Sequence, residues 1–193
     1  MSEFDSIIRI LSNIPQGISA AAEKGLSDAA LLVAKTAKEK LGTYQPAVGD
    51  FPAWQKLRPE SVRRKYLSKS GSYRAANGRR LTRAGQRYLR EHGNWGAGGN
   101  ADAPLVDTGH LRQAITTDLS HISEGVAYIG VASGSAERRG SAPGNYAAAH
   151  EFGYAAKNIP PRPFLRPAVH ENQEAIKDII AETIRDGVRD TWR

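Results

Sequence analysis

The sequence has 193 residues, no cysteine and a formal net charge of +7. A chain of this length suits one domain with an elaboration, and the absence of thiols excludes disulfides, thiolate catalysis and thiolate zinc sites. Because no stretch approaches the roughly 20 apolar residues of a membrane-spanning helix, and because MSEFDSIIRILSNIP is unlike a secretory signal, we expect a protein made in a cytoplasm with no membrane partner.

The positive charge is concentrated in one segment. Residues 58–99 hold eleven Lys or Arg against two acids, a local balance of +9, and the other 16 basic and 18 acidic residues sum to −2. We therefore divide the chain into a nearly neutral body, formed by residues 1–57 and 100–193 as one domain, and a basic insert, residues 58–99. The location of the charge is more informative than its size, because it singles out one surface.

The first part of the chain predicts helices followed by an irregular linker. Residues 4–11 place apolar side chains at helical spacing, and Pro15 is expected to interrupt the helix. A second helix is expected over residues 18–41, where an alanine-rich stripe repeats every three or four residues and Gly42 is a natural stop. Two prolines and two glycines among aromatic residues predict a linker over residues 42–57.

The basic insert predicts two short helices, residues 59–67 and 81–91, joined by a polar loop and followed by a glycine-rich tract. Arginines interleaved with tyrosines and a tryptophan are typical of a surface that meets phosphates, without reading base sequence. The alternatives are docking onto an acidic ring of a neighbouring protein, or a solvated face. The residues predicted to contact DNA or an acidic partner are Arg63, Arg64, Lys65, Arg79, Arg80, Arg83, Arg87 and Arg90.

The last part of the chain predicts a hairpin flanked by helices. A short helix capped by Thr108 leads into a strand at residues 115–122, and a second strand at residues 125–133 follows a turn. A two-turn helix over residues 146–153 is expected to stop at its glycine. Four prolines predict an extended segment over residues 158–168, because each disfavours the helical region for the residue before it.

A final amphipathic helix is expected over residues 168–192, with isoleucines and valines on one side and charges on the other. The predicted fold class is α+β. We expect a small antiparallel sheet packed against a long N-terminal helix and the C-terminal amphipathic helix, with the basic insert mostly helical.

The proline-rich segment has two interpretations. Extended backbone leaves polar groups without internal partners, so the segment is suited to lie along another surface. Its aromatic and aliphatic side chains would then insert into that surface, and the flanking arginines would pair with carboxylates. Alternatively, it connects the sheet to the last helix inside one subunit, with its phenylalanine in its own core. The residues predicted for a subunit or partner interface are Glu151, Phe152, Pro161, Arg162, Pro163, Phe164, Leu165 and Arg166.

Motifs that carry chemistry are weak in this sequence. The five histidines are scattered, and no pair has the HxxxH spacing that sets two imidazoles on one helical face. His150 precedes Glu151, but Tyr154 stands where a zinc helix would place a second histidine. The glycines and serines of residues 130–141 lack the spacing of a phosphate loop or a nucleophile elbow. We expect no catalytic residue, no metal site and no cofactor, and hence no enzyme.

The order of motifs in the second half resembles a known family. PLVDTGHLRQAI, a strand pair ending in YIGV, NYAAAHEFG and IPPRPFLRPAV before an amphipathic helix are similar to the tail-completion or virion-morphogenesis (neck, head–tail joining) proteins of long-tailed bacteriophages, of Mu-like or lambdoid type. Trp54 and Leu57 before RPESVRRK look like the Mu-like version. The resemblance covers about residues 50–185 and is poor over residues 66–100.

The resemblance implies a structural virion protein, an α+β subunit of the neck or head-proximal tail that is made in the host bacterial cytoplasm. Its partners would be copies of itself, in a hexameric ring around the DNA channel, and adjacent neck, tail-terminator or tail-tube proteins. DNA passing through the channel would be contacted without sequence preference. The alternative is a non-specific nucleic-acid-binding protein that uses residues 58–99 as its working surface.

Overall fold

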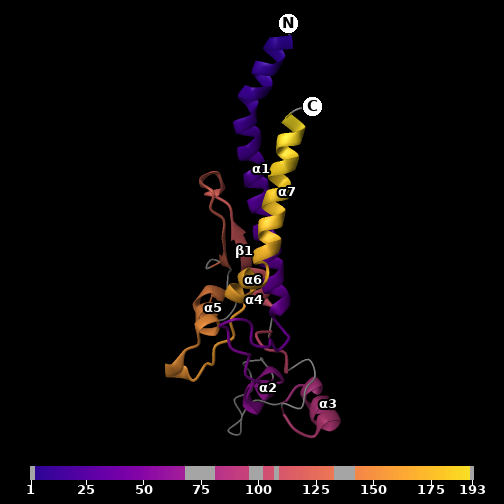
Figure 1. Cartoon of the computed structure of the whole chain (residues 1–193). Helices are drawn as coiled ribbons and strands as arrows, with labels where there is room; N and C mark the ends of the chain where they lie inside the picture. Colours follow the sequence, from indigo (N-terminus) through magenta and orange to yellow (C-terminus); the bar gives the residue numbers. More distant parts are fainter. Residues whose placement is uncertain (1–2, 68–80, 96–101, 107–108, 133–141, 192–193) are drawn as a thin grey trace.

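The structure is a computed structural model that describes residues 3–67, 81–95, 102–106, 109–132 and 142–191. Two helices dominate it, α1 (Glu3–Lys40) and α7 (Gln173–Thr191). They lie side by side with both chain termini at the same end of the molecule (Figure 1). We call this helix pair the stalk.

Small residues let the two stalk helices approach closely. A side chain at Gly187 would place its Cβ 2.4 Å from the Cβ of Ala21, and one at Gly25 would come within 3.0 Å of the Cα of Ile180. Neither position has room for a methyl group without a shift of the partner helix. The close contact with the final helix is made by Ala21 and Gly25, while the last residues of the apolar stripe on α1, Val33, Ala37 and Leu41, are buried in the body core.

The prediction that Pro15 interrupts the first helix is wrong. The helix runs from Glu3 to Lys40 with Pro15 inside it. A proline removes one backbone hydrogen bond and crowds the preceding turn, which favours a bend but allows the remaining hydrogen bonds on both sides to continue the helix.

The sheet is a two-stranded antiparallel hairpin, as predicted, but its strands are shorter. β1 (Ile115–Asp118) pairs with β2 (Tyr128–Val131), with Ile115 opposite Val131. A single 3-10 turn, η2 (Ile122–Glu124), lies between them. The short helix α4 (His110–Ala114) leads directly into β1; Gly109, at a φ of 80°, occupies its N-cap position, and the predicted Thr108 cap lies outside the described residues.

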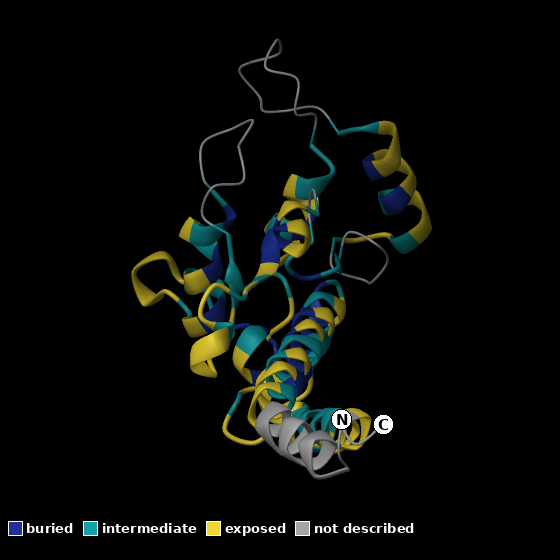
Figure 2. Ribbon diagram, turned by 90° about the horizontal axis from the view of Figure 1, so that it is seen from above, coloured by how far each residue is buried: buried dark blue, intermediate teal, exposed yellow. Residues whose placement is uncertain are grey.

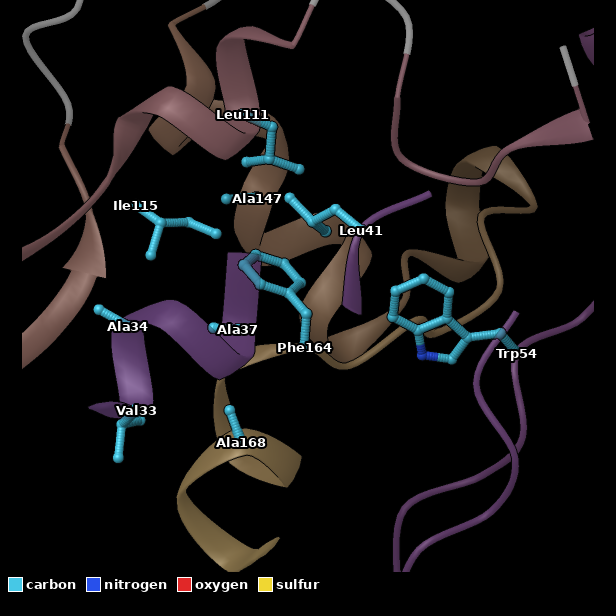
Figure 3. Close-up of a cluster of buried hydrophobic side chains, with 10 residues drawn as sticks. All are labelled: Val33, Ala34, Ala37, Leu41, Trp54, Leu111, Ile115, Ala147, Phe164 and Ala168. Atoms are coloured by element: carbon cyan, nitrogen blue, oxygen red, sulfur yellow. The ribbon is translucent and has the colours of Figure 1, made fainter. Parts of the chain in front are cut away.

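The body has one hydrophobic core, and residues from every part of the body reach it (Figure 3). Phe164 lies at its centre with no exposed surface, between helix α1, helix α4 and the first strand. The fold class is therefore α+β, with a small antiparallel sheet, a long N-terminal helix and a C-terminal helix. The buried members of the core are Val33, Ala34, Ala37, Leu41, Trp54, Leu111, Ile115, Ala147, Phe164 and Ala168.

The linker after α1 is irregular, as predicted, and is tied to the body by two aromatic residues. Trp54 is buried and donates a hydrogen bond from its indole nitrogen to the carbonyl oxygen of Pro163, at 3.0 Å. The hydroxyl of Tyr44 donates to a carboxylate oxygen of Asp102 at 2.6 Å and accepts from the amide of Leu57 at 2.8 Å. Burial and the neighbouring carboxylate raise the pKa of Tyr44, so its proton stays on the phenol.

The insert forms a small unit at the end of the molecule away from the chain termini (Figure 1). Its helices are α2 (Pro59–Lys65) and α3 (Arg83–His92), close to the predicted ranges. The hydroxyl of Thr82 accepts a hydrogen bond from the amide of Gly85 and caps α3. The buried side chains of the insert are separate from the body core. Seen from above, the exposed residues cover the outer faces of its helices (Figure 2).

No helix in the part of the chain that the structure describes is long and apolar enough to cross a membrane.

Candidate interaction surfaces

The proline-rich segment and the helix before it form a sharp reversal, which we call the elbow (residues 150–167). Helix α5 (Pro143–Phe152) ends at Gly153, which has a φ of 80°. A Cβ at Gly153 would meet the ring of Pro161 at 3.1 Å, so only glycine fits this turn. One 3-10 turn, η3 (Ala155–Lys157), then brings the chain back toward α5.

A buried carboxylate holds the elbow together. Glu151 is 4% exposed, and its oxygens accept hydrogen bonds from the backbone amides of Phe164 at 2.7 Å, Leu165 at 3.1 Å and Arg166 at 3.1 Å. The guanidinium Nε of Arg166 donates to the same carboxylate at 3.1 Å. These amides are the free donors of a helix N-terminus, where a negative charge is also favoured by the helix dipole.

This cap explains why the proline-rich segment is not extended throughout. Helix α6 (Leu165–Glu171) begins inside the segment, so the prediction of extended backbone to residue 168 is wrong. Pro167 falls in the first turn of α6, where its missing amide hydrogen has no helical acceptor to lose. Within the segment, Asn158 is left-handed with a φ of 52°, and residues 160–163 lie outside any helix. A break at Asn172 separates α6 from α7.

An exposed aromatic group stands on this rigid base. Phe152 is 64% exposed, and the Arg166 guanidinium lies 4.4 Å from the centre of its ring and 5.3 Å from the ring of Phe51. Arg166 also donates to the carbonyl oxygen of Glu151 at 3.0 Å. We call Phe51, Phe152 and Arg166 the aromatic–arginine patch. Its guanidinium is fixed by hydrogen bonds and ring contacts while one face of the phenylalanine stays open.

The structure divides the predicted interface residues into two groups. Four of the eight are buried in their own subunit, so their side chains offer no surface to a partner and the interface prediction is corrected for them. The four are Glu151, Arg162, Pro163 and Phe164. Arg162 donates to the carbonyl oxygen of Gln55 at 3.0 and 3.3 Å, and the ring of Phe164 fills the core. Exposed surface is left on Phe152 and Arg166, and partly on the residues Pro161 and Leu165.

The elbow also contains a histidine whose pKa is strongly lowered. Burial and the nearby positive charge of Arg162 lower the pKa of His150 to about 4. Its Nδ1 is buried without a hydrogen-bond partner among the described residues. A neutral imidazole at pH 7 is therefore part of the elbow, a feature that the sequence pattern His-Glu did not reveal.

The carboxylate of Glu151 has a structural role in the elbow. Both oxygens of Glu151 are occupied by structural hydrogen bonds, so the carboxylate is not placed to take up a proton. Within the described ranges, no three His, Asp or Glu side chains are grouped as metal ligands.

The basic insert presents arginines outward and aromatic rings inward. Tyr88 is 4% exposed and stacks between His92, at 4.3 Å between ring centres, and Trp95, at 5.5 Å. Tyr66 lies against Tyr88 at 4.9 Å. These rings form the interior of the insert together with Val62, so the described aromatic residues of the insert do not form an exposed stacking platform.

Five of the eight predicted basic contact residues are exposed. None of the five lies within ion-pair distance of a carboxylate in the described part of the chain. Lys65 instead donates to the carbonyl oxygen of Ala103 and ties the insert to the body, while Arg79 and Arg80 lie outside the described residues. The five exposed residues are Arg63, Arg64, Arg83, Arg87 and Arg90.

Comparison with known proteins identifies no family for this chain. No family model matches it. A stretch of 40 residues is 45% identical to an uncharacterized protein of Methanocaldococcus jannaschii, and it spans 21% of this chain and 30% of the archaeal protein. No solved structure matches the chain. The archaeal likeness is limited to a short segment and carries no function with it.

Proposed function

We propose that the protein is a structural subunit of a tailed-bacteriophage virion, located at the neck or head-proximal tail, where copies assemble as a ring. The observation that carries the proposal is the aromatic–arginine patch. The patch combines an exposed phenylalanine with a fixed arginine, and aromatic residues and arginines are enriched among the residues that dominate protein–protein binding. Because Glu151 holds this patch in place before any partner arrives, little conformational entropy is lost on association.

The motifs that resemble the phage family support the proposal because they meet in one place. Leu111, Ala147 and Phe164 come from three of these motifs, and all three are buried in the same core. In the elbow, Glu151 at the end of NYAAAHEFG accepts hydrogen bonds from backbone amides of IPPRPFLRPAV and so joins these two motifs. These motifs therefore occur together for a structural reason: the core that supports the aromatic–arginine patch needs residues from each of them.

A second candidate function is supported by the insert. Five exposed arginines without carboxylate partners form a basic surface that would attract phosphates. On this hypothesis the protein binds nucleic acid of any sequence through residues 58–99, and self-association is incidental. The two functions differ in their need for Phe152: the virion subunit requires this residue, and a nucleic-acid-binding protein that works through the insert does not.

The proposed function is tested by removing the gene from a phage genome that encodes this chain. We expect the deletion strain to release filled heads and separate tails, visible by electron microscopy, and wild-type particles to contain the chain in their purified protein. A plasmid copy with Phe152→Ala is expected to restore few joined particles. Leu31→Ala, which removes an exposed apolar side chain on α1 away from the elbow, is the matched control and is expected to restore them.

Two results would overturn the proposal. One is normal joined particles from the deletion strain, together with the absence of the chain from purified wild-type particles. The other is full rescue by Phe152→Ala combined with loss of rescue when Arg63, Arg64, Arg83, Arg87 and Arg90 are changed to Gln, which would place the function on the basic surface.

A further inference from the structure

An open groove runs between the two stalk helices. It encloses about 670 Å³ and is lined on the α1 side by Gly17, Ala20 and Ala21, and on the α7 side by Thr183 and Gly187, among others. These small residues make its floor shallow enough for long side chains from outside to lie in it. We call it the stalk groove.

The stalk groove is acidic, although the chain as a whole is basic. Its lining holds one lysine, Lys24, against four acids. Three of these, Glu182, Asp186 and Asp190, recur every four residues along α7 and therefore share one face of that helix. The ion pairs Lys24–Asp28 and Asp186–Arg189 are exposed surface pairs, which contribute little and exchange readily for other partners.

Helix α3 has the opposite charge at a matching spacing. Arg83, Arg87 and Arg90 are exposed on one face of α3, opposite the buried ring of Tyr88. At 1.5 Å per residue, successive acids on α7 are about 6 Å apart along the helix, and the arginines on α3 are about 6 and 4.5 Å apart. Two helices lying side by side would therefore bring the charges into register.

A subunit cannot satisfy this match within itself. The insert lies at one end of the molecule, and the stalk, with both chain termini, extends from the other (Figure 1). We infer that the α3 arginine face of one copy docks in the stalk groove of a second copy. This inference rests on the proposed ring assembly and specifies its contact, because the two surfaces differ and the resulting interface is head-to-tail. Such an interface closes into a ring when its rotation permits.

The acidic groove favours a second copy over DNA as the occupant of the α3 face. Nucleic acid would account for the arginines but would be repelled by the stalk groove, whereas a second copy accounts for both surfaces. Electrostatic contacts of this kind weaken as salt is added, since the Debye length falls to about 8 Å at physiological ionic strength. Binding of the full chain to itself should therefore weaken with increasing salt.

The test uses charge reversal on each side of the proposed contact. The arm variant carries Arg83→Glu, Arg87→Glu and Arg90→Glu, and the groove variant carries Glu182→Lys, Asp186→Lys and Asp190→Lys. All six positions are exposed, so circular dichroism is expected to show wild-type folding. We expect each variant to associate roughly tenfold to a hundredfold more weakly than wild type, measured as mass against concentration by analytical ultracentrifugation at low salt.

Mixing and combining the variants separates this contact from a general charge effect. An equimolar mixture contains two compatible contacts: the unmodified α3 of the groove variant with the unmodified groove of the arm variant, and the reversed α3 of the arm variant with the reversed groove of the groove variant. The two variants should therefore associate with each other in alternation, although each alone associates weakly. The six-fold variant, with both surfaces reversed in one chain, should regain association. The matched control is Arg58→Glu with Arg63→Glu and Arg64→Glu, the same charge change in the same insert but off α3, and it should associate like wild type.

Three results would overturn the inference. The first is a wild-type chain that stays monomeric at every concentration at low salt. The second is a control variant that fails as badly as the arm variant. The third is a groove variant that associates normally while only the arm variant loses retention on a random-sequence DNA fragment, which would assign α3 to nucleic acid. In each case the rescue experiment with Phe152→Ala would still test the proposed function separately, because Phe152 belongs to neither surface of this contact.

Discussion

The body and the insert use their residues in opposite ways. In the body, nine buried side chains from both halves of the chain pack with Phe164 in one core. In the described part of the insert, the hydrophobic cluster has two buried members, Val62 and Tyr88, against which Leu57, Tyr66 and Trp95 pack. The body is thus stabilised by apolar burial across distant parts of the sequence, while the insert depends on a few aromatic contacts.

This difference has a consequence for mutations. Changes at buried body positions should lower the free energy of unfolding, because they remove apolar contacts that nothing else replaces. Changes on the insert surface should leave stability nearly unaltered and act on association, because its exposed arginines have no ion pair with a carboxylate among the described residues. Variants of the body and of the insert test this division.

Phe164→Ala is expected to lower the free energy of unfolding by roughly 3–5 kcal/mol, because the side chain is wholly buried and its removal leaves a cavity. The measurement is equilibrium denaturation by urea followed by tryptophan fluorescence, since Trp54 borders the same core. Phe152→Ala is the control, a phenylalanine of the same elbow that is 64% exposed, and should change stability little. Equal losses from the two variants would contradict the division of the elbow into core and surface.

Glu151→Gln is expected to lower the free energy of unfolding by roughly 2–4 kcal/mol, because an amide cannot accept from the amides of Phe164, Leu165 and Arg166 as a carboxylate does. The same urea titration measures it. Glu174→Gln, an exposed carboxylate at the start of α7, is the control and should be nearly neutral. A neutral result for Glu151→Gln would mean that the amides of α6 find other acceptors.

The elements with a strong local signal could be predicted from the sequence. Alternating apolar residues after a turn predicted the second strand of the hairpin, and the glycine of EFG marked the end of α5, where φ is 80°. Both signals act over a few neighbouring residues, so no knowledge of the rest of the chain was needed.

The start of α6 could not be predicted in this way. Its helix depends on Glu151, fourteen residues before Leu165, and a pattern of prolines read alone favours extended backbone. The same contact distinguishes Phe152 from Phe164: one is held at the surface and the other is drawn into the core, although both are phenylalanines beside charged residues. The acidic stalk groove was likewise not predicted, because its two walls are about 160 residues apart in the chain.

Acidification should destabilise the body through His150. The pKa of this histidine is lowered to about 4 by burial and by Arg162, whereas in the unfolded chain it returns to about 6.5. Between these values the unfolded state binds more protons, so stability is full above pH 6.5 and falls as the pH drops toward 4. We expect His150 to account for a loss of roughly 1–2 kcal/mol between pH 7 and pH 5.

The measurement is the urea unfolding of wild type and His150→Gln across this pH range. The variant should lose less stability than wild type on acidification, and the difference between the two curves isolates this residue from the carboxylates. His121→Gln, at an exposed histidine near the hairpin, serves as the control and should leave the wild-type curve unchanged. Parallel curves for wild type and His150→Gln would show that the imidazole is already solvated in the folded body.

Trp95→Ala gives the smallest expected effect and tests whether the insert is a separate stability unit. The ring of Trp95 lies 5.5 Å from Tyr88 and 5.6 Å from Tyr66, and its loss should weaken the insert by roughly 1 kcal/mol. Hydrogen exchange should then speed up several-fold for the amides of α3 and stay at the wild-type rate for those of α1, because regions with separate cores open independently. Faster exchange in both helices would mean that the two clusters unfold together. The body and the insert would then differ in charge but not in stability.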